Sequence, residues 1–434
     1  MAADIRNMKT SAEQALSAAY TGARGKLPGL PDLREQAFRE FEARGLPHRR
    51  VEEWKYTDLR ALMREMPPLA GAPDAAAKAR AKDARGVLAG IDTRRIVFVD
   101  GVFAPELSDL SPEPGLTIGS LAYALASGDA LATQRVGKVF ATDDVAVALN
   151  TALMGDGAVI HVAAGVQIAR PIHLVFAGSE TPASVFVRSL VVVEKGARVI
   201  LIEDHDSGAV QVNAALDLVA AAESQIDYFK ITQARAPHVA SLLASIGAKA
   251  SFNTFAFTRH SSLVRNQSFI RFAGEHTESG MRGVSLLKGK EHVDTTLLVE
   301  HAKGHCRSRE QFKMVLDNES HGVFQGKIIV QPHAQKTDAK MASHALLLSD
   351  EAEADNKPEL EIFADDVQCG HGATAGALDE SLKFYLMARG IPEREAEALL
   401  IQSFVGEAIE TISHEGVRAD LMFAAVRWLG ARSV

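Results

Sequence analysis

The sequence of 434 residues contains few cysteines, no excess of positive charge and no long apolar run. Cys306 and Cys369 are its only thiols, so at most one disulfide can form, which fits a reducing compartment. A formal net charge of -8 argues against nucleic acid as the main partner, because neutralising phosphates requires a basic face. No segment approaches the roughly 18 apolar residues of a membrane helix, and we expect no export on the pattern of residues 1–20. We expect a cytoplasmic, soluble protein without a membrane partner.

Familiar catalytic and ligand-binding motifs are also missing. No phosphate-binding loop of the GxxxxGK[ST] or GxGxxG type lies between a strand and a helix, so no nucleotide site is predicted. The patterns CxxC, HExxH and GxSxG do not occur either. A free-standing β-helix enzyme acting on carbohydrate remains an alternative, but such enzymes set carboxylates on consecutive coils. The candidates Glu275, Glu278, Asp294 and Glu300 do not recur at a constant spacing.

The sequence pattern divides the chain into three zones. They are residues 1–155, mostly helical with a mobile linker near 66–84; residues 156–376, built from short strands; and residues 377–434, helical again. The elements expected in the outer zones are helices over Pro31 to Arg44, Leu116 to Ser127 and Asp143 to Met154, a hairpin turning at Asp100-Gly101, a helix from the N-cap Asp379 to Arg389, and two longer helices whose apolar stripes include Leu399, Phe404 and Phe423. The helical zones are expected to cap both ends of the central zone.

The central zone repeats with a nearly fixed period and shows no helical pattern. Aligning its apolar runs places six residues at equivalent positions, 26 to 28 residues apart: Leu190, Leu216, Leu243, Phe269, Leu297 and Val323. Such a period predicts a β-solenoid, in which each turn stacks on its neighbour, whereas an ordinary β-sandwich is the alternative. Phe252, Phe255 and Phe257 are expected to fill its interior.

The stretch DDVQCGHGATAG, residues 365–376, brings one of the two cysteines next to a histidine. In an extended backbone Cys369 and His371 project to the same side and could reach one metal ion. Two ligands make an incomplete site, because zinc or iron normally takes about four, so water or a second protein would supply the rest. A catalytic dyad fits the residue types, but no orienting partner can be named. The stretch is expected to form the hinge between the last coil and the C-terminal helices.

A second set of candidate ligands lies in the histidine-rich region from His301 to His371. His301, His305 and Cys306 fall within six residues and could bind a soft or borderline metal. Alternate residues of a strand point to opposite sides, however, so these three side chains need not converge. Polar side chains at the corners between coils explain the scattered histidines more simply. A stand-alone metal-binding protein stays an alternative.

The longer motifs resemble the SufB/SufD family of iron–sulfur cluster assembly proteins, and the SufD branch within it. The resemblance rests on EEWKYTDL (52–59), HVDTTLLVEH (292–301), HCRSREQFK (305–313) and KPELEIFADDVQCGHGATAG (357–376). Two features favour SufD over SufB: the chain has only two cysteines, and Gly372 stands where SufB proteins carry a glutamate. The role of the Trp54 segment is open between an aromatic docking anchor and partner binding.

The resemblance implies a right-handed β-helix between N- and C-terminal helical regions. It also implies a non-enzymatic scaffold that pairs with SufB through the β-helix and binds the ATPase SufC through its C-terminal helical region. His371 would then contribute to a transient Fe–S cluster or iron shared with SufB, and Cys369 has the weaker claim. The family is further implicated in iron acquisition. The isolated chain could form a homodimer.

Overall fold

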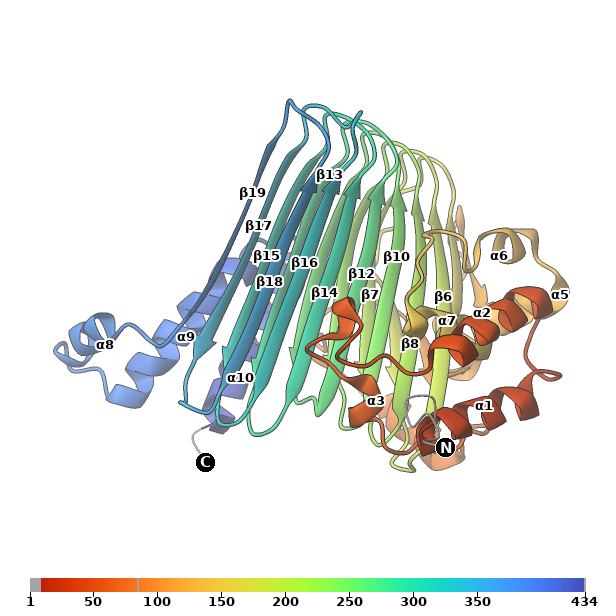
Figure 1. Ribbon diagram of the computed structural model, residues 1–434, viewed down its shortest axis with the longest axis horizontal. Coiled ribbons are helices and arrows are strands. Elements are labelled where there is room, and N and C mark those ends of the chain that lie inside the picture. The colour runs from red at the N-terminus through yellow and green to blue at the C-terminus, as the bar shows by residue number, and fades with distance from the viewer. Residues whose placement is uncertain (1–8, 84–85, 433–434) are drawn as a thin grey trace, which may run out of the picture.

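The computed structural model describes residues 9–83 and 86–432, and its centre is a β-solenoid of about eight turns (Figure 1). Each turn contributes one strand to each of two sheets, so from β4 to β19 strands that are consecutive in sequence lie in opposite sheets. Within a sheet, successive turns pair in parallel. The predicted mainly β solenoid with flanking helices is therefore confirmed, and the sandwich alternative is excluded.

Within the described residues, sheet A has nine strands and sheet B has ten. The strands of sheet A are β3 (Leu116–Ser120), β4 (Ala158–Val162), β6 (Ser184–Val193), β8 (Gln211–Ala220), β10 (His238–Ile246), β12 (Leu263–Phe272), β14 (His292–His301), β16 (His321–Val330) and β18 (Glu353–Ile362). Those of sheet B are β1 (Arg94–Val99), β2 (Val102–Phe103), β5 (Ile172–Ala177), β7 (Arg198–Asp206), β9 (Gln225–Gln233), β11 (Ser251–Arg259), β13 (Glu278–Leu287), β15 (Arg307–Leu316), β17 (Asp338–Leu347) and β19 (Gln368–Gly376).

The helices lie outside the solenoid. They are α1 (Ser11–Ala23), α2 (Pro31–Arg44), α3 (Leu59–Leu62), α4 (Ala75–Asp83), α5 (Leu121–Ser127), α6 (Ala130–Arg135), α7 (Val145–Leu153), α8 (Glu380–Met387), α9 (Glu393–Ile409) and α10 (Glu415–Arg432), with 3-10 turns η2 (Glu52–Trp54) and η3 (Pro105–Leu107). Among the described residues, none of these helices is long and apolar enough to cross a membrane.

The register of the repeat differs from the predicted alignment, although the period is close. Leu243 does pair with Phe269, but Leu216 pairs with Ser189 and Leu242. Farther along, Val323 pairs with Asp294 instead of Leu297. Corners of unequal length cause these slips, and a slip of one residue moves a side chain to the opposite face of its sheet.

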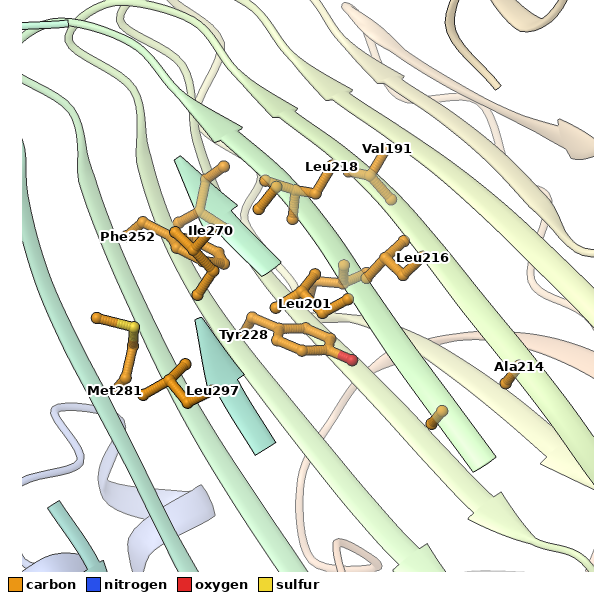
Figure 2. Close-up of a cluster of buried hydrophobic side chains, with 14 of the residues drawn as sticks. Val191, Leu201, Ala214, Leu216, Leu218, Tyr228, Phe252, Ile270, Met281 and Leu297 are labelled. Atoms are coloured by element: carbon orange, nitrogen blue, oxygen red, sulfur yellow. The ribbon is translucent and has the colours of Figure 1, made fainter. Parts of the chain in front are cut away.

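The solenoid interior is a continuous apolar core formed by alternate residues of both sheets. Leu201 and Tyr228 from sheet B meet Leu216 and Leu218 from sheet A (Figure 2). Phe252 belongs to this core, as predicted. Phe255 and Phe257 do not, because they lie on the outer face of sheet B, buried in a separate cluster with α9 and α10.

The N-terminal region covers the outer face of sheet A and extends both sheets. Helix α2 has the predicted bounds and ends at Gly45, whose φ of 67° suits glycine. The predicted hairpin is also confirmed, since β1 and β2 are antiparallel around Asp100-Gly101, both at positive φ. The helix expected over 116–127 is half wrong, because its first five residues form β3, paired with β4.

The segment predicted as a linker near 66–84 contains helix α4. Ala77 and Ala81 of this helix are buried against Val97 and Val99 of β1. Residue 84 lies outside the described residues. Alanine and lysine are good helix formers, so the composition that suggested a linker equally suits a short helix.

The Trp54 segment fastens the N-terminal region to sheet A. Trp54 is 1% exposed and donates its indole N–H to Asp144 at 2.9 Å. The guanidinium of Arg265 stacks 3.8 Å from the centre of its ring and pairs with Asp294. Asp294 also accepts a hydrogen bond of 2.6 Å from the Thr57 hydroxyl. These contacts give the segment the docking role that the sequence left open.

The C-terminal helices pack across the outer face of sheet B and do not cover the end of the solenoid. Helix α9 contacts β13 and β15, and Trp428 of α10 joins the same buried cluster. The expected cap over the last turn is therefore wrong at this end. The predicted stripes are also shifted, since Leu399 and Phe423 are exposed. The apolar outer face around Phe255 is the surface that these helices bury.

Candidate functional site at the open end of the solenoid

The stretch predicted as a hinge is strand β19, the last strand of sheet B. Cys369 pairs in register with Ala339 of β17, and His371 pairs with Met341. Both partners belong to the interior core, so Cys369 and His371 turn toward the interior as well. The predicted common side of the two side chains is confirmed. The hinge is corrected, because residues 368–376 continue the parallel ladder for one more turn.

This last turn leaves the end of the solenoid uncovered. Strands β18 and β19 are the edge strands of sheets A and B (Figure 1). His371 is exposed, and a Cβ added to Gly370 or Gly372 would meet nothing within 4 Å. Phe363, just after β18, is 59% exposed. An edge with free backbone groups and exposed apolar side chains is a template for pairing with another chain.

The surroundings of Cys369 favour the neutral thiol over the thiolate. Burial raises the pKa of this half-buried thiol, and the negative charges of Asp338 and Glu310 raise it further, while a backbone hydrogen bond from Ala339 offsets part of the rise. The thiolate is the form that binds metals, so a cation at this site would have to displace the proton. The raised pKa makes Cys369 a weaker nucleophile at neutral pH than an ordinary exposed thiol.

The other predicted metal ligands do not converge. His301 points into the interior, where its Nε2 lies 3.0 Å from the Ser308 hydroxyl. Cys306 is buried and donates to the carbonyl of Gly274 at 3.2 Å. His305 sits at an exposed corner and stacks on His276. Within residues 9–83 and 86–432, no group of three or more His, Cys, Asp or Glu side chains could hold a metal ion.

The carboxylates considered for a carbohydrate-active enzyme are also dispersed. Asp294 is fully buried beneath the N-terminal region, bound to Arg265 and Thr57. Glu300 pairs with Arg271 at 2.6 Å. Both carboxylates are used in fastening structure, so they do not form the pair that glycoside hydrolysis needs.

Two buried carboxylates inside the solenoid escaped the sequence reasoning. The first is Glu203 of β7, which lies 2.5 Å from Lys230 Nζ and 2.6 Å from His205 Nε2, and which accepts a 2.9 Å hydrogen bond from Tyr228. Burial raises the pKa of Glu203, but Lys230 and His205 outweigh it and hold the pKa well below the usual value.

The second is Glu310 of β15. Burial raises the pKa of its carboxyl to about 7, and the neighbouring Ser308 hydroxyl offsets part of the rise. A signal for this residue was present in the sequence: in RSREQFKMVL, Glu310 has the same alternation parity as Phe312 and Met314, both of which face the core.

Comparison with known proteins places residues 19–404 in one family. Residues 19–174 match the SufBD protein N-terminal region, and residues 175–404 match the SufBD core domain of SUF system FeS cluster assembly. The chain is 29% identical to the iron-sulfur cluster assembly protein SufD of Escherichia coli over 89% of its length and 90% of that protein. It is also 29% identical to an iron-sulfur cluster assembly SufBD family protein of Synechocystis, over 85% of its length and 84% of that protein. With the SufD of Bacillus subtilis the identity is 25% over 66% of this chain and 69% of that protein. Because the core model alone spans more than half of the sequence, the chain belongs to the SufBD family of iron–sulfur cluster assembly proteins, in which it is SufD-like.

Proposed function

We propose that this chain is a non-enzymatic scaffold subunit of the Suf iron–sulfur cluster assembly complex. It pairs with SufB through the open end of the solenoid and binds the ATPase SufC through its C-terminal helices. The observation that carries the proposal is the uncovered last turn, which presents Cys369 and His371 beside two free strand edges. The three zones predicted from the sequence correspond to these roles: 1–155 fastening, 156–376 scaffold and 377–434 docking.

The chemistry of the open end suits a shared site. Imidazole and thiolate are good ligands for iron and iron–sulfur clusters. Two side chains leave a coordination shell of about four half empty, and a partner chain on the same edge supplies the remaining ligands. The cluster and its iron are then cargo that is assembled between two proteins, with His371 as the stronger ligand of this chain. Without SufB, a second copy of the chain would meet the same edge.

The C-terminal helices offer a separate surface for the ATPase. Helix α8 packs against α9, projects from the solenoid and buries none of its residues (Figure 1). Phe384 is 72% exposed and Tyr385 is 51% exposed. Large apolar side chains gathered on a projecting helix are typical of protein–protein contacts. The hydrolysis of ATP would take place in SufC, since this chain carries no phosphate-binding loop.

Co-expression with SufB and SufC tests the two surfaces separately. The unaltered chain should copurify with both proteins and yield a complex that accumulates iron and sulfide. Replacing Phe384 and Tyr385 by serine should release SufC and retain SufB. His371→Ala should retain both partners and lose the cluster, whereas the control His344→Ala, on the outer side of β17, should keep it. A chain that purifies alone, or a His371→Ala complex with its full cluster content, contradicts the proposal.

A further inference from the structure

The two strand edges at the open end of the solenoid expose different backbone groups. Alternate residues of a parallel strand turn their N–H and C=O groups to opposite neighbours. In β18 the amides of Glu353 and Phe363 donate to the preceding turn of sheet A, so the even-numbered residues between them turn their amides to the free edge. Pro358 is one of these residues and has no N–H. A strand that pairs with β18 therefore finds one donor missing near its centre.

The edge of β19 has a complete set of donors. Gln368 donates to Thr337, so the odd-numbered residues of β19 turn their amides outward, and none of them is proline. The side chains on the outer face of β19 are uncharged: Gln368, Gly370, Gly372, Thr374 and Gly376. Proline and charged side chains are the usual means by which an edge strand restricts pairing. Strand β19 is therefore an unrestricted edge.

Charged side chains line the outer face of β18. Ala354 and Leu360 pack against the interior core, so the alternate, odd-numbered residues face outward. These residues bear four carboxylates and one ammonium, a net charge of -3: Glu353, Asp355, Lys357, Glu359 and Glu361. Strand β18 therefore carries both features that restrict pairing, a proline and a row of charges.

The neighbouring strand shows which side chains these carboxylates accept. On the inner side of β18, Lys327 of β16 lies 2.5 Å from Glu361, and His321 lies 2.8 Å from Asp355. Opposite charges on paired strands stabilise a sheet, whereas like charges directly opposite destabilise it. Because these pairs are partly exposed, such charges contribute more to the choice of partner than to stability. A strand that continues the pattern on the free side carries lysine or arginine on its outer face.

A second copy of this chain offers the opposite of such a strand. An antiparallel pair about a two-fold axis places β18 against β18, because a symmetric interface uses the same surface twice. Both outer faces are then acidic, and both strands lack the donor at Pro358. We propose that β18 selects against a second copy of the chain and for a different protein, whose edge strand carries lysine or arginine on the outer face of the joined sheet. The inference deepens the proposed function and rests on it.

Self-association of the isolated full-length chain, measured by analytical ultracentrifugation, tests the inference. Neutralising the four carboxylates of β18 should tighten self-association by about 10-fold, because each like-charge pair across strands weakens pairing. This neutral variant is Glu353→Gln, Asp355→Asn, Glu359→Gln and Glu361→Gln. The matched control neutralises four exposed glutamates away from the open end and should associate like the unaltered chain: Glu40→Gln, Glu180→Gln, Glu223→Gln and Glu275→Gln.

Reversing the four charges of β18 sharpens the test. A variant with lysine in place of the four carboxylates should bind the unaltered chain about 10-fold more tightly than the unaltered chain binds itself. The mixed pair should weaken as salt is raised from about 0.05 M to about 0.5 M, whereas self-association of the unaltered chain should strengthen. Thermal unfolding of each variant shows that it is folded.

The outcomes separate this inference from the proposed function. If neither neutralisation nor charge reversal tightens association relative to the control, the inference is overturned, whatever the partners do. If the unaltered chain nevertheless copurifies with SufB, the proposed function stands without it. If the charge variants associate as expected but the unaltered chain forms no complex with SufB and SufC, the selection by β18 stands and the proposed function fails.

Discussion

Two buried carboxylates in the same solenoid interior have opposite surroundings. Glu203, near the N-terminal end, is within hydrogen-bond distance of Lys230, His205 and Tyr228. Glu310, near the open end, has no hydrogen-bond partner within the described part of the chain. The pKa of the first carboxyl is held well below its usual value, and the pKa of the second rises from 4.5 to about 7.

The difference shows that one core can contain both a paired and an unpaired carboxyl group. Charges buried for stability come with partners, because the desolvation cost must be offset in the folded chain. A buried carboxyl group without such partners lowers this cost by keeping its proton. Glu203 belongs to the first kind. Glu310 belongs to the second, because burial raises its pKa to about 7. Three experiments test this contrast.

The largest effect should come from breaking the Glu203 network. Lys230→Met removes the cation and leaves a buried carboxylate beside a neutral imidazole, which should lower the free energy of unfolding by about 3–5 kcal/mol. Urea unfolding at pH 7, followed by circular dichroism, measures the loss. Lys195→Met is the control, because its pair with Glu223 is exposed and should contribute less than about 1 kcal/mol. Equal losses in the two variants would remove the structural role given to Glu203.

The second effect is a decrease in stability with rising pH, caused by Glu310. The folded chain keeps a proton on Glu310 between pH 4.5 and about 7 that the unfolded chain releases, so stability falls as the pH rises through this window. Glu310→Gln removes the fall. Its stability relative to the unaltered chain should therefore increase by about 3 kcal/mol from pH 4.5 to pH 7 and stay level above. Urea unfolding across this range decides, and a difference independent of pH would mean that Glu310 is not buried as a lone carboxyl.

The smallest effect should appear at Cys369. Above pH 7 the ionised Glu310 disfavours the thiolate, so Glu310→Gln should lower the pKa of Cys369 and speed its alkylation at pH 8 by a few-fold. Peptide mass spectrometry distinguishes Cys369 from the buried Cys306, which serves as the internal control. An unchanged rate at Cys369 would show that the two groups do not interact across β17.

The sequence was sufficient for the solenoid and for the shared orientation of Cys369 and His371, because both depend on local alternation and on a repeat. The register between turns could not be predicted from the sequence, because the corners vary in length and no single period holds from Leu190 to Val323. The same uncertainty hid the outer position of Phe255 and Phe257. Central strands of a parallel sheet are apolar on both faces, so the pattern alone does not tell which face the C-terminal helices cover.

The glycines of residues 365–376 misled the prediction for a physical reason. Glycine-rich segments usually turn, yet Gly370 and Gly372 lie in strand β19 at an edge where no neighbouring side chain demands packing. Glu310 belongs to no recognisable motif, so strand parity is the signal in the sequence that indicates its interior position. Phe312 and Met314 face the interior, and Glu310 lies on the same face of strand β15.

The two ends of the solenoid set a limit on how far chains can add to one another. At the N-terminal end β2, of two residues, and β3 both run antiparallel to their neighbours, so a further parallel turn finds no matching template there. Among the strand edges of residues 9–83 and 86–432, only the edge formed by β18 and β19 repeats the geometry of the interior turns. A unit with one competent end stops growing after a single addition, whereas a unit with two would polymerise into fibres. A solenoid with one competent end can therefore stack on one other chain along its axis and no further.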